Sequence, residues 1–133
     1  MLVTIEKVLL LKQMPLFKTV SNMALSDLMA VSEEQTIKKG ERLIEAGMQN
    51  KVVYFILSGR VSEERATEKK TLEGHSVVGL DSVFWIAPTE KDVTVKQDSV
   101  VLKVEKDKLY RMMALHPSLA MAILHELSEK IHK

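Results

Sequence analysis

The glycines of this chain set the strongest limit on its fold, because all five lie between residues 40 and 79 and each follows a short run of β-forming residues. Glycine adopts the positive φ angles that sharp turns need. Three further runs, 61–64, 91–96 and 99–104, bring the number of strands to about eight. The runs that end at glycines are 35–38, 42–45, 52–57, 71–72 and 77–78. Short strands at this spacing predict a jelly roll, or double-stranded β-helix, rather than βαβ units.

On both sides of this central region, the spacing of apolar residues is typical of helices. Apolar spacing predicts a helix over residues 2–13, ended by Pro15, and another over 22–31, with Asn22 or Ser26 as its cap. Two more helices are expected at 106–115 and from Pro117 onward. The predicted fold class is mainly β with helices at both termini, in a single domain over residues 1–133. Its parts are N-terminal helices (1–32), a β-roll (33–105) and C-terminal helices (106–133).

Charge and composition exclude several classes of protein. The net charge is +1, from 19 basic and 18 acidic residues, which does not suit a dedicated nucleic-acid surface. There is no cysteine, so disulfides and thiolate metal sites are excluded. The apolar stretch 8–11 is too short and too closely flanked by charge to enter a membrane. No helix-turn-helix follows the last helix, so we expect no DNA reader, and a cytoplasmic location.

Three motifs carry a resemblance to a known family. They are the glycine before the second strand (Gly40), the turn Glu45-Ala46-Gly47, and the hairpin from Tyr54 through Gly59 to Val61. Together they resemble the cyclic nucleotide-binding domain family over nearly the whole chain. The resemblance implies a β-roll in a regulatory, signal-transducing protein without enzyme activity. The opening, residues 5–17, also resembles the version of this domain that is attached to larger membrane or helical-repeat proteins.

The resemblance also implies where a ligand would bind. In the family, a phosphate-binding cassette reads roughly F-G-E-x-A-L and then R-x-A-T-V. Backbone N–H groups of a short helix and the Arg hold the cyclic phosphate, while the Glu accepts a hydrogen bond from the ribose. The matching stretch here is residues 78–95. Its candidate ligand-binding residues are Gly79, Leu80, Asp81, Ser82, Val83, Lys91, Asp92, Val93 and Thr94.

Several cassette positions depart from the family pattern. Leu80 replaces the ribose Glu, and a lost hydrogen bond to a charged group costs about 1.5–3 kcal/mol. Lys91 replaces the Arg, which keeps the charge but loses the two-pronged geometry. Asp92 puts an anion opposite the phosphate if it points inward, and Val93 is larger than the usual Ala. Asp81 is the candidate to replace the ribose contact, although one step along a helix turns its side chain by about 100°.

Other residues allow two interpretations each. Leu80 can line a pocket for a less polar ligand, or fill the space of the ribose. Trp85 can stack on a base or partner helix, or pack the cassette against the roll. His125, Glu129 and His132 have metal-ligand spacing on the last helix, but a solvated helix end is the favoured interpretation, so no metal or other cofactor is predicted. The charge run 67–70 is expected to be an exposed hairpin turn. No catalytic constellation is present, so an enzyme is not expected.

Two functions follow as hypotheses. In the first, the chain is a ligand-sensing regulatory domain with weak, altered or lost binding of cyclic AMP or cyclic GMP. By resemblance, a small anionic ligand at the cassette draws in a hinge at 116–117, and the last helix closes as a lid through Met121 and Leu124. In the second, the cassette binds no nucleotide, and the terminal helices dock to a larger protein or to a second copy in a homodimer.

Overall fold

The computed structural model describes residues 4–84 and 86–131. The chain divides into two compact units. A helical unit comprises the residues up to Ser32 and those from Asp107 onward, and a roll unit comprises Glu33–Lys106.

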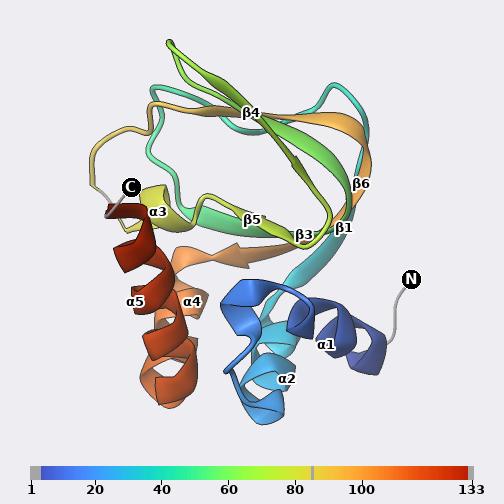
Figure 1. Cartoon of the computed structure of the whole chain (residues 1–133), viewed down its shortest axis with the longest axis vertical. Helices are drawn as coiled ribbons and strands as arrows, with labels where there is room; N and C mark the ends of the chain where they lie inside the picture. The colour runs from blue at the N-terminus through green and yellow to red at the C-terminus, as the bar shows by residue number, and fades with distance from the viewer. Residues whose placement is uncertain (1–3, 85, 132–133) are drawn as a thin grey trace. The chain divides into compact units, whose positions relative to one another are not determined.

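The roll unit is an antiparallel sheet with one short helix. Within the described residues it has six strands, β1 (Glu33–Ile37), β2 (Arg42–Ile44), β3 (Val52–Glu64), β4 (Lys69–Glu73), β5 (Ser76–Val78) and β6 (Asp92–Glu105), and the helix α3 (Leu80–Val83). The sheet order is β1-β6-β3-β4, while β2 pairs with β6 and β5 pairs with β3. The predicted class, mainly β with helices at both termini, is confirmed (Figure 1).

The strand number is lower than the expected eight, because two pairs of predicted runs each form one continuous strand. Runs 52–57 and 61–64 join in β3, whose register shifts between Ile56 and Val61 take up the glycine without ending the strand. Gly59 has φ 110°, and a Cβ there would lie 2.0 Å from Oγ of Ser99. Runs 91–96 and 99–104 join in β6. Figure 1 shows β3 and β6 as the two long curved ribbons of the sheet.

Asp98 lies inside β6 at the point where the sequence suggests a break. Its Oδ1 accepts a hydrogen bond from the backbone N–H of Lys39 at 2.9 Å, and its Oδ2 lies 3.6 Å from Nζ of Lys38. The Lys39 hydrogen bond, followed by the charge of Lys38, lowers the pKa of the Asp98 carboxyl. The acid therefore ties the bend of β6 to the β1–β2 turn rather than ending the strand.

Aliphatic side chains fill the inner face of the roll. The buried cluster consists of Ile37, Ile44, Tyr54, Ile56, Val61, Val78, Val93, Val95 and Val101. Burial, and then the nearby charge of Glu33, raises the pKa of the Tyr54 phenol. β-Branched residues dominate the cluster, and such residues suit a pleated, half-buried surface.

The helical unit contains five helices among the described residues. They are α1 (Thr4–Lys12), the 3-10 helix η1 (Pro15–Phe17), α2 (Asn22–Val31), α4 (Lys106–Leu115, whose first residue is counted with the roll unit) and α5 (Pro117–Ile131). The cap of α2 is Ser21, whose Oγ accepts a hydrogen bond from Ala24 N at 3.1 Å, so the expected caps Asn22 and Ser26 are wrong. Ser21 has extended backbone angles and Asn22 is already helical, which leaves Ser21 as the residue able to cap. No helix in the described part of the chain could span a membrane.

Candidate ligand-binding cassette

A left-handed glycine starts the cassette. Gly79 joins β5 to α3 with φ 86°, and it is the N-cap of α3. A Cβ at this position would lie 2.7 Å from Val52 O and 2.9 Å from Asn50 Nδ2. Both the backbone angle and the close approach therefore require glycine here.

Asn50 fixes this turn from the β2–β3 loop. The side chain is 7% exposed. Its Nδ2 donates to Val52 O at 2.8 Å, to Gly79 O at 3.2 Å and to Ser82 Oγ at 2.9 Å. Its Oδ1 accepts from Val52 N at 3.2 Å. One buried amide thus connects the start of β3 to both ends of the first turn of α3.

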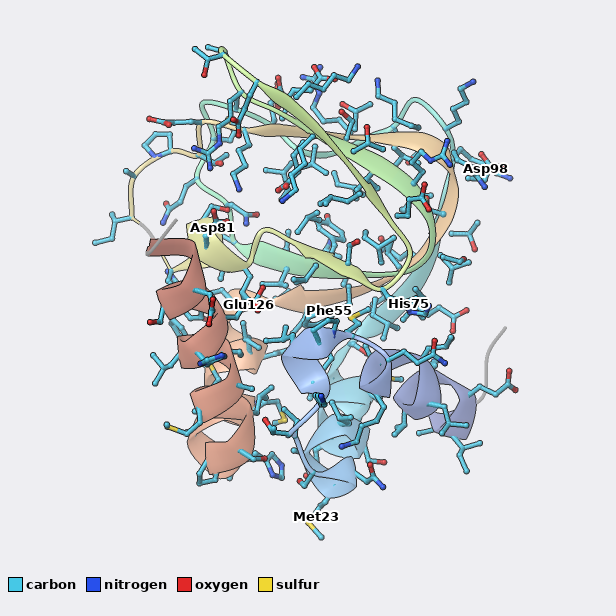
Figure 2. The ribbon with its side chains drawn as sticks, in the orientation of Figure 1. Met23, Phe55, His75, Asp81, Asp98 and Glu126 are labelled. Atoms are coloured by element: carbon cyan, nitrogen blue, oxygen red, sulfur yellow. The ribbon has the colours of Figure 1, made fainter. Side chains whose placement is uncertain are left out.

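The residues of α3 face in two directions. Leu80, Ser82 and Val83 are buried, with Leu80 only 1% exposed. The hydroxyl of Ser82 accepts from Asn50 and donates to Gly79 O at 3.4 Å. Asp81 is less buried, and Figure 2 shows it on α3. Leu80, which the resemblance aligns with the ribose acid, is therefore a buried aliphatic side chain.

Lys91 lies between two carboxylates. Its Nζ is 2.9 Å from Oδ2 of Asp81 and 3.4 Å from Oε2 of Glu63. The side chains of Lys91, Asp81 and Glu63 are 14%, 19% and 16% exposed. The site therefore contains two acidic side chains and one basic side chain. We call them the cassette triad.

Asp81 makes a second contact within the cassette. Its Oδ1 accepts a hydrogen bond from the backbone N–H of Ser82 at 2.8 Å. One carboxylate therefore engages both a backbone N–H of α3 and the ammonium of Lys91. Such contacts are charge-assisted and stronger than neutral hydrogen bonds.

The remaining candidates lie on β6. Asp92 accepts a hydrogen bond from Ala46 N at 2.8 Å and lies 3.8 Å from the guanidinium of Arg42, so it braces the end of β2. Val93 is fully buried in the core of the roll. Thr94 pairs in register with Arg42 and Ser62. The structure brings Gly79, Asp81, Ser82 and Lys91 into one connected group, and it engages Asp92 elsewhere.

The loop from α3 to β6 is held by backbone bonds. Gly47 N donates to Thr89 O, and Thr89 N donates to Met48 O, both at 2.9 Å. Lys91 N donates to Thr89 Oγ1 at 3.3 Å. These bonds position Lys91 at the start of β6. Trp85, expected either to stack or to pack in this loop, lies outside the described residues.

The expected hinge and lid residues belong to the helical unit. His116 joins α4 to α5, and its Nε2 lies 2.8 Å from Oδ2 of Asp27 on α2. The proposed lid residues Met121 and Leu124 are 65% and 56% exposed. His125 pairs with Glu129 at 3.5 Å on the surface of α5, while His132 lies outside the described residues. Within the described ranges, no group of three His, Asp or Glu side chains could hold a metal ion.

Two residues of the cassette, Glu63 and Asn50, are not among the candidates that the sequence predicts. Glu63 had a signal, because it is two residues after the core residue Val61 and alternation places both on one face of β3. Asn50 had none, because an Asn after Gly-Met-Gln in a loop is an ordinary turn residue.

The fold and this site define a class, a β-roll in which a glycine-started turn of helix lies beside a basic residue at the start of the last strand. A family model described as "Cyclic nucleotide-binding domain" matches residues 34–116, which is more than half of the chain. The chain belongs to the cyclic nucleotide-binding domain family.

Solved structures agree with this fold. The sensor domain of the transcriptional regulator DNR from Pseudomonas aeruginosa is 24% identical, covers 97% of this chain and 91% of its own, and has a TM-score of 0.79. The catabolite activator protein of Thermus thermophilus is 15% identical with a TM-score of 0.79, and the match covers 89% of this chain and 58% of that protein. A cyclic nucleotide-binding domain from Methylobacillus flagellatus is 17% identical over 97% of this chain and 76% of its own, with a TM-score of 0.78. No curated protein matches the sequence.

Proposed function

We propose that this chain is a non-enzymatic regulatory sensor domain whose cassette, at Gly79–Val83 and Lys91, binds cyclic AMP or cyclic GMP only weakly. The observation that carries the proposal is the burial of Leu80, which is 1% exposed at the position of the ribose acid. A leucine cannot accept the hydrogen bond of a ribose hydroxyl. A hydroxyl buried against it without a partner costs about 1–3 kcal/mol, or up to about a hundredfold in affinity.

The cassette backbone supports binding of some ligand. Gly79 keeps the left-handed turn, and Asn50 holds that turn through a buried amide. The resemblance assigns Lys91 as the cation for a ligand anion, and its ammonium is paired with Asp81 and Glu63 within the chain. The cassette therefore keeps the parts that recognise an anion and lacks the part that recognises a ribose.

The response to ligand is proposed by resemblance to the family. A ligand at the cassette would draw in the hinge at His116 and Pro117, and α5 would close as a lid. Met121 and Leu124 suit that role, since both are apolar and exposed on α5. We propose that such a regulator works in the cytoplasm.

A second candidate function rests on the exposed apolar side chains of the helical unit. Ile5 and Leu9 are exposed one turn apart on α1, and Met121 and Leu124 are exposed on α5. Such surfaces often mark contacts with other proteins. In this alternative the chain is an interaction module, docked to a larger protein or to a second copy, and it binds no nucleotide.

Calorimetry with cyclic AMP and cyclic GMP separates the two functions. For the native chain we expect heats of binding only at about millimolar ligand, near −4 kcal/mol in binding free energy. In the double variant Leu80→Glu/Lys91→Arg, we expect binding at least about tenfold tighter, because the ribose acceptor and the two-pronged cation are restored.

Each outcome decides between the proposals. Micromolar binding by the native chain would contradict the claim of weakened recognition. No heat at millimolar ligand for the native chain and the double variant would contradict the sensor function and leave the interaction module. Because Leu80→Glu places a carboxylate at a buried position, circular dichroism must first show that the double variant is folded.

A further inference from the structure

We infer that the carboxylate of Asp81 is a built-in counter-ion of the cassette, which occupies the donors an anionic ligand would need, so that the ligand binds only by displacing it. The inference rests on the proposed function, because it takes Gly79–Val83 and Lys91 as the ligand site. It adds a residue that sets the affinity and selectivity of that site.

The carboxylate of Asp81 accepts hydrogen bonds from both a cationic donor and a backbone donor. Oδ2 of Asp81 accepts from Lys91 Nζ at 2.9 Å, and Oδ1 accepts from Ser82 N at 2.8 Å. A ligand anion held by the cassette cation and a backbone N–H of α3 would use the same two groups. Asp81 therefore competes with such an anion directly rather than from a distance.

Glu63 strengthens the competition. Its Oε2 lies 3.4 Å from the same ammonium, from the inner face of β3. Displacing Asp81 would leave Lys91 still paired with Glu63, and an incoming anion would face two carboxylates with one cation between them. With less than a fifth of each side chain exposed, solvent screens these charges only partly.

The arrangement also explains how the cassette is ordered by itself. A partly buried ammonium needs an opposing charge, and the two carboxylates provide it within the chain. The short helix α3 is held at Asp81 by this pair and at Gly79 and Ser82 by Asn50. The result is a domain that keeps its cassette folded without an anion and responds only to a ligand able to replace a carboxylate.

The test removes the charge of Asp81 while keeping its shape. Asp81→Asn retains an oxygen for Ser82 N and removes the negative charge beside Lys91. Glu90→Gln is the matched control, since Glu90 is an exposed acid in the loop between α3 and β6 and its loss changes the net charge equally. Binding of inorganic phosphate and of cyclic AMP is measured by calorimetry for both variants, the native chain and Leu80→Glu/Lys91→Arg.

We expect Asp81→Asn to bind both probes at least about tenfold more tightly than the native chain, with Glu90→Gln unchanged. If the double variant binds cyclic AMP more tightly but Asp81→Asn gains nothing, then the counter-ion inference is wrong while the proposed site stands. An equal gain in Glu90→Gln would show a general charge effect and also contradict it. If neither the native chain nor any of the variants binds phosphate or cyclic AMP, then the proposed site and the inference both fail.

A ligand-free measurement provides an independent check. Asp81→Asn leaves Lys91 paired with Glu63 alone, so its thermal midpoint should fall below that of Glu90→Gln. Added phosphate should raise the midpoint of Asp81→Asn more than that of the native chain, because the anion takes the place of the lost carboxylate. Equal midpoints and equal responses to phosphate for the two variants would overturn the inference.

Discussion

Replacing Asn50 tests the contact network that shapes the cassette. From a buried position, the two N–H groups of the amide are shared among three acceptors, and its oxygen accepts one hydrogen bond. A typical hydrogen bond contributes about 1 kcal/mol net, and buried groups left without a partner cost about 1–3 kcal/mol. Gly79 O also accepts from Val83 N at 3.0 Å, so part of the loss is compensated. We therefore expect Asn50→Ala to lower the free energy of unfolding by about 2–4 kcal/mol.

Asn50→Asp makes the test more specific, because it keeps the shape and the acceptor oxygen but places a second oxygen toward Val52 O, Gly79 O and Ser82 Oγ. At neutral pH this charged variant should be less stable than Asn50→Ala, since a buried carboxylate would face the carbonyl oxygens of Val52 and Gly79, and only the Ser82 hydroxyl could donate to it. Urea unfolding followed by circular dichroism measures the free energy of unfolding of both Asn50 variants. The control is Asn22→Ala, at the exposed start of α2, whose free energy of unfolding should lie within about 0.5 kcal/mol of that of the native chain. A loss below about 0.5 kcal/mol in Asn50→Ala would refute the stabilising role of the network.

Two further predictions concern the backbone conformation at Gly79 and the loss of stability at low pH. Gly79→Ala should lower the free energy of unfolding, measured in urea, by about 1–3 kcal/mol more than Gly47→Ala does. Both glycines have positive φ, but of the two only Gly79 has atoms within contact distance of an added Cβ. Equal losses in the two variants would refute this close-approach argument. Since the pKa of Asp98 is lowered by folding, its contribution to stability is fully present above the ordinary value of 3.8 and is lost as pH falls from there through the folded-state pKa. Thermal unfolding from pH 2 to 6 should therefore show a shallower acid decline for Asp98→Asn, and unchanged steepness would contradict the assigned hydrogen bond.

Much of the fold was readable in the sequence, because turns and apolar patterns are local. The glycines and β-rich runs predicted the roll, and Pro117 predicted the start of α5. The strand count failed at Gly59 and at Asp98, where a bulge and a bend resemble turns locally but the pairing of β3 with β6 continues past them. The charge run 67–70 was expected to be a turn, yet Lys69 and Lys70 belong to β4 and pair with Glu64 and Glu63 in register.

The site was less predictable than the fold, because its chemistry depends on contacts between distant residues. Resemblance selected Lys91 and Asp81 as separate candidates, but nothing in their spacing showed that their side chains pair. Glu63 and Asn50 are 28 and 29 residues from their cassette partners Lys91 and Gly79. Only the folded sheet brings such groups together.

The pairing of β3 with β6 also determines when the cassette can form. The ladder runs from Val52 opposite Glu105 to Glu64 opposite Asp92, and α3 lies in the segment that this ladder encloses. Pairing of distant segments is slow, since the loop must close before the contacts form. During synthesis, β4 and β5 can pair with one edge of β3 first, while the edge that pairs with β6 stays open along the apolar run 53–57 until residues 92–105 emerge. We therefore expect the yield of folded protein to depend on how quickly residues 92–105 pair with the open edge of β3.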